Sequence, residues 1–189
     1  MGHDNKRTDT IATMRLALIL TASLALTGAA SHAYAYDDGA PWGAGNPSDK
    51  NHCASCHWER VPQQHSPQIT LKGLPDSLNT NTVYALDLIF DDPDMQIGAF
   101  QMLVLGANGS VGKFTGNAEI LDTTANGAMI RSRKPETALA GRVRWRFAWQ
   151  SSAAAPEPPV FYVAVIASNN DGSAFGDTVH YRRIEFATR

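Results

Sequence analysis

The chain has no marked excess of charge of either sign. Its 16 Lys and Arg residues are dispersed among 18 Asp and Glu residues, which leaves a formal net charge of -2 at pH 7. A nucleic-acid-binding surface or a polybasic membrane patch needs clustered cations that meet phosphate groups. The sequence has no such cluster, so we expect no nucleic-acid partner.

Long hydrophobic runs are also missing. The longest apolar stretch, residues 16–27, covers about a dozen residues, whereas roughly 20 are needed to cross a bilayer. Basic residues precede this stretch, and the small-residue cleavage pattern Ala33-Tyr34-Ala35 follows it. This order predicts a secretory signal peptide over residues 1–35, with translation starting at Met1 or at Met14. We therefore expect a periplasmic or secreted protein with no permanent membrane span.

Patterns typical of common enzyme sites are absent as well. The sequence has no evident Ser, His and Asp set, no phosphate-binding glycine loop and no pair of catalytic carboxylates. No long amphipathic helix follows residue 57. We expect a protein that is not an enzyme.

Short segments of alternating polarity fill the chain from residue 68 onward. In residues 142–150, four large apolar side chains alternate with arginines and polar residues, which predicts a strand with one buried and one solvated face. Similar segments, separated by turn residues, are 69–74, 83–90, 100–105, 118–121, 128–133, 160–167 and 178–186. About eight strands in about 120 residues predict an all-β fold, an immunoglobulin-like antiparallel β-sandwich over residues 68–189 with Trp145 and Trp149 in its core.

Both cysteines of the chain lie in one short motif, Cys53-Ala54-Ser55-Cys56-His57. Two thiols at this spacing reach both vinyl groups of a haem as thioethers, and the histidine after them is an axial ligand of the iron. We therefore expect one covalently bound haem c, attached through Cys53 and Cys56, with Nε2 of His57 on the iron. The motif falls in residues 36–67, whose Gly, Pro and Asn content is typical of a flexible leader.

Three other uses of the cysteine pair remain open. They are a thioredoxin-type dithiol, part of a zinc site completed by His52 or His65, and a structural disulfide. A redox dithiol normally begins a helix after a parallel strand, and the sequence around Cys53 has no such pattern. Haem attachment is the interpretation that gives a role to both thiols and to His57.

The second axial ligand of such a haem is not fixed by the sequence. His65 is the first candidate, because a loop bounded by prolines is able to fold over a haem face. The others are His52, His180, Met95, Met102 and Met129. Met102 alternates in phase with its apolar neighbours, which favours a place in the core. Met95 stands in an acidic turn, which favours the surface.

Two polar clusters and one basic strip are weaker candidates. The Asp residues within 87–94 and the Asn- and Asp-rich loop 169–177 are conceivable calcium sites, but solvated Asx turns are the preferred interpretation. Arg142, Arg144 and Arg146, together with the nearby Arg131 and Arg133, form a strip that suits haem propionates or an acidic partner. The solvated face of a sheet is the preferred interpretation of this strip.

The order of several segments resembles a known family. The chain has Gln68-Ile69-Thr70-Leu71-Lys72-Gly73-Leu74-Pro75, then Asn81-Thr82-Val83-Tyr84, then Trp145-Arg146-Phe147-Ala148-Trp149, then Asn169 to Gly172. Over residues 47–186 this order resembles the Reeler-like immunoglobulin-like domain, which bacteria carry as the choice-of-anchor V domain. The resemblance implies a secreted β-sandwich with a Cys-x-x-Cys-His motif just ahead of its first strand, and it implies no enzymatic activity.

The chain departs from that family at two places. Members often carry a Thr-His pair where this chain has Ile130-Arg131-Ser132-Arg133, so we expect no distal histidine from that strand. Many members also continue into a C-terminal anchor, whereas this chain ends at Arg189, directly after the last predicted strand. This second departure favours a soluble product.

Together these features predict a monohaem, c-type electron-transfer protein that meets an unidentified periplasmic redox partner. Two alternatives stay open. One is an extracellular binding or adhesion module in which Cys53 and Cys56 form a disulfide. The other is a haem-based gas sensor with an open axial position.

Overall fold

The computed structural model describes residues 39–50, 52–153 and 158–185. The predicted signal peptide therefore lies outside the described residues. The chain forms a short 3-10 helix, η1 (Cys53–Ser55), and eleven strands. The strands are β1 (Ile69–Lys72), β2 (Val83–Asp91), β3 (Ile97–Gly106), β4 (Gly109–Ser110), β5 (Lys113–Gly116), β6 (Leu121–Thr123), β7 (Met129–Ser132), β8 (Glu136–Thr137), β9 (Arg142–Gln150), β10 (Val160–Ser168) and β11 (Thr178–Ile184).

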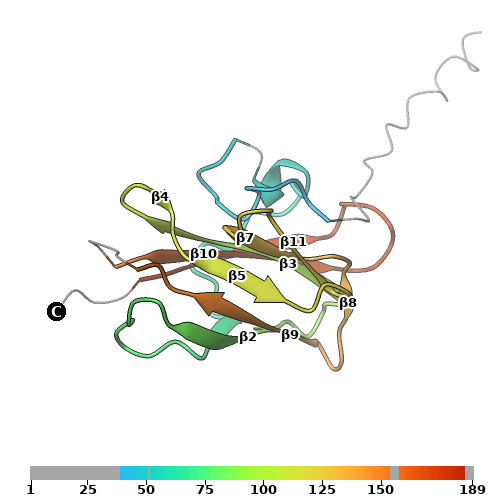
Figure 1. The fold of residues 1–189 in the computed structure, drawn as a ribbon. Coiled ribbons are helices and arrows are strands. Elements are labelled where there is room, and N and C mark those ends of the chain that lie inside the picture. The colour runs from blue at the N-terminus through green and yellow to red at the C-terminus, as the bar shows by residue number, and fades with distance from the viewer. Residues whose placement is uncertain (1–38, 51, 154–157, 186–189) are drawn as a thin grey trace, which may run out of the picture. The chain divides into compact units, whose positions relative to one another are not determined.

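Two antiparallel sheets pack face to face, which confirms the predicted all-β sandwich (Figure 1). The four-stranded sheet has the order β1-β2-β9-β5. The seven-stranded sheet has the order β11-β10-β3-β7-β6, and β4 and β8 also pair with β3. Among the described residues, no helix has the length and apolarity needed to cross a membrane.

The main core lies between the two sheets, and β9 shows why these residues form strands. Its inward side chains Val143, Trp145, Phe147 and Trp149 are buried, and the arginines between them are exposed. The period of two predicted for this segment is therefore confirmed, and both tryptophans lie in the core.

Other strand predictions fail where the alternation is short. Residues 118–120 form a turn rather than a strand, because the Asn117 carbonyl accepts hydrogen bonds from the backbone N–H groups of Ile120 and Leu121. The strand β6 begins only at Leu121. Sequence patterning also does not reveal β5, since Phe114 is its one buried side chain.

Residues 39–50 and 52–57 lie on the outer face of the seven-stranded sheet, away from the four-stranded sheet (Figure 1). Their composition is typical of a flexible leader, yet Ala44, Cys53 and Ala54 are buried against Ala164, Val179 and Tyr181 in a second apolar cluster. Gly45 comes so near to β3 that an added Cβ would lie 3.0 Å from the carbonyl oxygen of Gln101. The segment next follows β11 at Gln63 and Ser66.

Candidate haem-attachment site

The helix η1 fixes the Cys-x-x-Cys-His motif on the outer face of the seven-stranded sheet. The backbone N–H of Ala54 donates to the hydroxyl of Tyr181 on β11, at 3.3 Å. The thiol of Cys53 is 6% exposed and donates to the carbonyl of Ala44 at 3.1 Å, and burial raises the pKa of this thiol to about 12. Cys56 is exposed, and the two cysteines are not joined by a disulfide.

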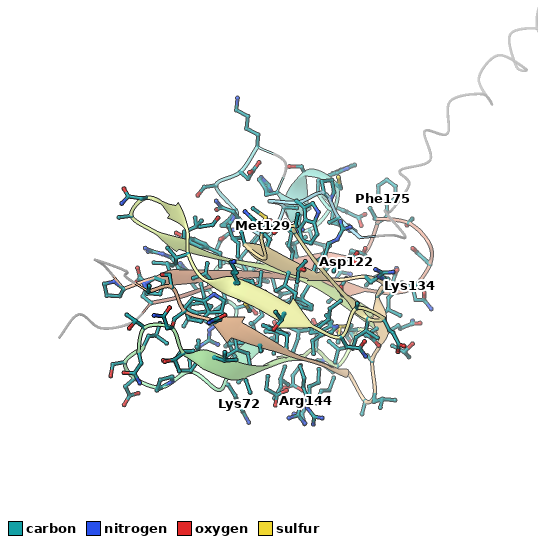
Figure 2. All side chains as sticks on the ribbon, in the orientation of Figure 1. Lys72, Asp122, Met129, Lys134, Arg144 and Phe175 are labelled. Atoms are coloured by element: carbon teal, nitrogen blue, oxygen red, sulfur yellow. The ribbon has the colours of Figure 1, made fainter. Side chains whose placement is uncertain are left out.

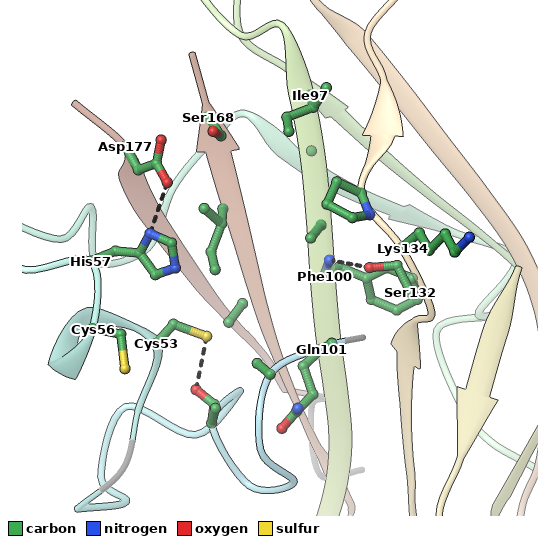
Figure 3. A pocket seen from close by; sticks show the side chains of 18 of the residues that line it. Cys53, Cys56, His57, Ile97, Phe100, Gln101, Ser132, Lys134, Ser168 and Asp177 are labelled. Atoms are coloured by element: carbon green, nitrogen blue, oxygen red, sulfur yellow. Dashed lines mark hydrogen bonds and ion pairs between the residues drawn. The ribbon is translucent and has the colours of Figure 1, made fainter. Parts of the chain in front are cut away.

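A cavity of about 460 Å³ adjoins the motif (Figure 3). Cys53, Cys56 and His57 line one side of it, and the outward side chains of β3 and β10 line another. Ala99 and Ala164 belong to this second wall, and their small side chains leave room above the sheet. The volume falls within the range of roughly 300–1,000 Å³ that is usual for ligand and cofactor pockets.

His57 is oriented by a buried carboxylate. Its Nδ1 lies 2.8 Å from Oδ2 of Asp177, the residue just before β11, and Asp177 is 2% exposed. The other ring nitrogen of His57, Nε2, faces away from Asp177 toward the cavity (Figure 3). A metal-ligating histidine usually donates its second ring N–H to a carboxylate or a carbonyl in this way.

Two polar side chains on the sheet side of the cavity, those of Gln101 and Ser132, already have partners. Gln101 is buried, its Oε1 accepts from the backbone N–H of Gly45 at 3.0 Å, and its Nε2 donates to the carbonyl of Pro41 at 3.0 Å. The hydroxyl of Ser132 accepts from the backbone N–H of Phe100 at 3.1 Å. The bonds of Gln101 tie the N-terminal segment to β3, and the bond of Ser132 ties β7 to β3.

The donor set fits a covalently attached haem. Two thiols and one imidazole line a single cavity, and Nδ1 of that imidazole is in contact with Asp177. Cys53 and Cys56 would hold the group through thioethers, and His57 would bind its iron.

The structure does not bring His65 to this cavity. His65 is exposed in a turn with a φ of 59°, and backbone bonds of Gln63 and Ser66 to β11 anchor that turn at the sheet edge. The expectation that His65 folds over the haem face therefore finds no support in the geometry.

The remaining axial candidates are spread over the molecule. Met102 lies in the core, as expected, and Met95 is also buried there, which corrects its expected surface position. His180 is buried on β11, and Met129 is half-buried on β7. Among the described residues that line the cavity, His52 is the one histidine besides His57.

The arginines of the predicted strip do not lie together. Arg131 stands on β7 of the seven-stranded sheet and Arg133 just after it, and both pair with Asp122. Arg142 and Arg144 project from the outer face of the four-stranded sheet, where they pair with Asp91 and Asp87 (Figure 2). Salt-bridging to Arg144 holds the pKa of Asp87 below its usual range. The preferred interpretation as a solvated sheet face agrees with this arrangement, and a role of Arg142 and Arg144 toward haem propionates does not, because the cavity adjoins the other sheet.

The metal-ion alternatives are not matched by the geometry. Within the described ranges, no three His, Cys, Asp or Glu side chains gather as the ligands of an ion. Loop 169–173 forms Asx-type turns instead, in which Oδ1 of Asp171 accepts from the backbone N–H of Ser173 at 2.9 Å.

Sequence reasoning misses two features that the fold assembles. Asp177 lies 120 residues from His57, and the loop in which it stands reads as an ordinary turn. The structure also places Ser66, His180 and Asp92 in a line, with Ser66 Oγ 3.0 Å from Nδ1 of His180 and Asp92 3.7 Å from its Nε2. Ser66 is 1% exposed and lies outside the cavity, and its contact with His180 links the segment before β1 to β11.

Comparison with known proteins supports the fold. No protein-family model matches the sequence, and no curated protein shows significant sequence similarity to it. The Reelin-N domain of F-spondin superposes with a TM-score of 0.53 at 12% identity, over 72% of this chain and 96% of that one. The human F-spondin reeler domain (fragment 1) gives a TM-score of 0.48 at 13% identity, over 68% of this chain and 96% of that one. The chain therefore has a Reeler-like β-sandwich fold.

Proposed function

We propose that this chain is an exported, single-haem c-type redox protein that exchanges one electron at a time with a partner protein. The observation that carries the proposal is the His57–Asp177 pair, which leaves Nε2 of His57 facing a cavity that both cysteines line. The predicted signal peptide supports export, since covalent attachment by the bacterial route takes place outside the cytoplasm.

Each residue of the motif has a defined role in this proposal. The thiols of Cys53 and Cys56 would hold a haem by adding to its two vinyl groups, an addition that consumes no oxidant because each thiol proton goes to a vinyl carbon. His57 binds the iron through Nε2. The bound haem then supplies a one-electron Fe(III)/Fe(II) couple.

The surrounding fold supplies rigidity and shielding. The wall formed by β3 and β10 is part of a seven-stranded sheet, and the N-terminal segment is bonded to that sheet through Gln101 and Tyr181. The exposed Cys56 side of the motif leaves one edge accessible to a partner. Transient electron-transfer complexes use small interfaces of this kind.

The test is to express the full chain in a host that is competent for periplasmic haem attachment. We expect the mature protein to keep a haem band after acid denaturation, to show a thioether-haem pyridine spectrum and to gain the mass of one haem. The double variant Cys53→Ser, Cys56→Ser should lose all three signals, and His65→Ala should keep them. A colourless mature chain without added mass contradicts the proposal and leaves the binding-module alternative.

A further inference from the structure

We propose that Asp177 is the positioning residue of the axial ligand. It accepts the Nδ1–H of His57, which fixes the tautomer whose Nε2 is free for iron and strengthens that nitrogen as a donor. This inference rests on the proposed role of His57 as an iron ligand.

The contact between His57 and Asp177 is held in place by η1, which precedes His57, and by β11, which follows Asp177. His57 follows η1, whose residue Ala54 is bonded to Tyr181 on β11. Asp177 directly precedes β11, and the backbone N–H of its neighbour Gly176 donates to Oε2 of Glu59 at 2.5 Å. One bond therefore joins η1 to β11 and another joins Glu59, just after the motif, to the β10–β11 connection, in addition to the 2.8 Å contact between Nδ1 and Oδ2.

Because Asp177 is buried, its charge acts mainly on His57. Asp177 is 2% exposed, and its one ion-pair partner among the described residues is His57. Its second oxygen, Oδ1, is buried without a hydrogen-bond partner in the same part of the chain. A buried carboxylate acts more strongly on its neighbour than an exposed one because water screens it less.

The expected consequence is electronic as well as geometric. A carboxylate that accepts the Nδ1–H makes the imidazole a stronger donor and favours the more positively charged state of the metal. Asp177 should therefore lower the reduction potential of the bound haem.

The experiment compares two carboxylate-to-amide variants of the holoprotein. Asp177→Asn removes the buried charge and leaves a side chain of nearly the same shape. Asp171→Asn is the matched control, because Asp171 stands in the same connection, is exposed, and bonds to Ser173 and Asn169 rather than to His57. The readouts are the midpoint potential, the iron–histidine stretching band of the reduced protein by resonance Raman, and the thermal unfolding midpoint.

We expect Asp177→Asn to shift the potential upward and the stretching band to lower frequency, and Asp171→Asn to change neither. Equal effects of the two variants on potential and band overturn the inference, even if Asp177→Asn unfolds at a lower temperature. A wild-type chain without haem would refute the proposed function instead.

A separate measurement covers the case in which Asp177→Asn does not retain haem. Nitrogen-15 NMR of the full wild-type chain before haem attachment reports the tautomer of His57 directly. Protonation at Nδ1 with a bare Nε2 supports the positioning role, and protonation at Nε2 overturns it.

Discussion

His180 is a buried titratable residue remote from the cavity. It is 2% exposed on β11, its ring contacts Phe90 edge-on with 4.7 Å between ring centroids, and Nδ1 lies 3.0 Å from the hydroxyl of Ser66. Burial lowers the pKa of His180, and the nearby Asp92 opposes this shift more weakly. The folded state therefore favours the neutral imidazole.

The lowered pKa of His180 makes the free energy of unfolding depend on pH. In the unfolded chain a histidine takes up a proton near pH 6.5, whereas folded His180 does so only at lower pH. The stabilisation is thus complete above about pH 6.5 and is lost as the pH falls through the folded-state pKa. We expect His180→Gln to flatten the dependence of the free energy of unfolding on pH between about pH 5 and 7.

Urea unfolding at several pH values measures this effect. His65→Gln is the matched control, since His65 is exposed, and it should keep the wild-type dependence. An unchanged slope in His180→Gln would show that other groups account for the acid sensitivity.

At the scale of residues, the sequence identifies the motif from Cys53 to His57 but not Asp177, which orients His57. The spacing of Cys53, Cys56 and His57 follows from covalent connectivity, so a short helical turn is enough to place them together. The distance from His57 to Asp177 depends on how the chain before β11 packs, and no local pattern encodes it.

At the scale of elements, β9 carries much of the core. Trp145 is 1% exposed and stacks at a tilt on Phe100, with 4.7 Å between ring centroids. Truncation of a buried aromatic side chain removes its apolar contacts and leaves a cavity. We expect Trp145→Ala to lower the free energy of unfolding by about 3–5 kcal/mol.

Chemical denaturation followed by circular dichroism gives this value. The control is Trp58→Ala, since Trp58 is 64% exposed, and its change should stay within about 0.5 kcal/mol. Similar losses in the two variants would mean that β9 does not hold the sheets together as described.

The contrast between β9 and β5 explains which elements the sequence predicts. Nine residues of strict alternation identify β9, because its two faces meet different environments. The four residues of β5 bury one side chain, and their pairing with β9 is what makes them a strand.

At the scale of the whole molecule, the cavity lies on the outer face of one sheet and the methionine candidates Met95 and Met102 lie inside the sandwich. Met102 points inward on β3, where successive residues point to opposite sides, and Met95, which precedes β3, is buried in the same core. The haem of the proposed holoprotein therefore depends on the cavity wall, or on an external molecule, for its second axial position.

We expect the oxidised holoprotein to have a high-spin absorption spectrum that His65→Ala leaves unchanged, because His65 is remote from the cavity. Added imidazole should convert this spectrum to a low-spin form. His52→Ala is the companion variant, since His52 lines the cavity and its Nδ1 lies 3.4 Å from the Tyr181 hydroxyl.

A low-spin wild-type spectrum that His65→Ala abolishes would restore His65 as the axial ligand. Loss of a low-spin spectrum in His52→Ala alone would assign that position to His52. Carbon monoxide should bind to the reduced protein for the same reason that imidazole binds, and the gas-sensor alternative makes the same prediction.

The sequence alone determined the features that depend on neighbours along the chain. These are the two-residue period of the long strands, the spacing of the cysteine motif and the buried tryptophans of β9. Tertiary structure decided which distant groups meet: the docking of residues 39–50 and 52–57 on the outer sheet face, the cavity beside Cys53 and the contact of His57 with Asp177. The reason is physical, since periodicity and spacing are local, whereas a cavity and a buried contact between distant side chains arise only when separate segments pack together.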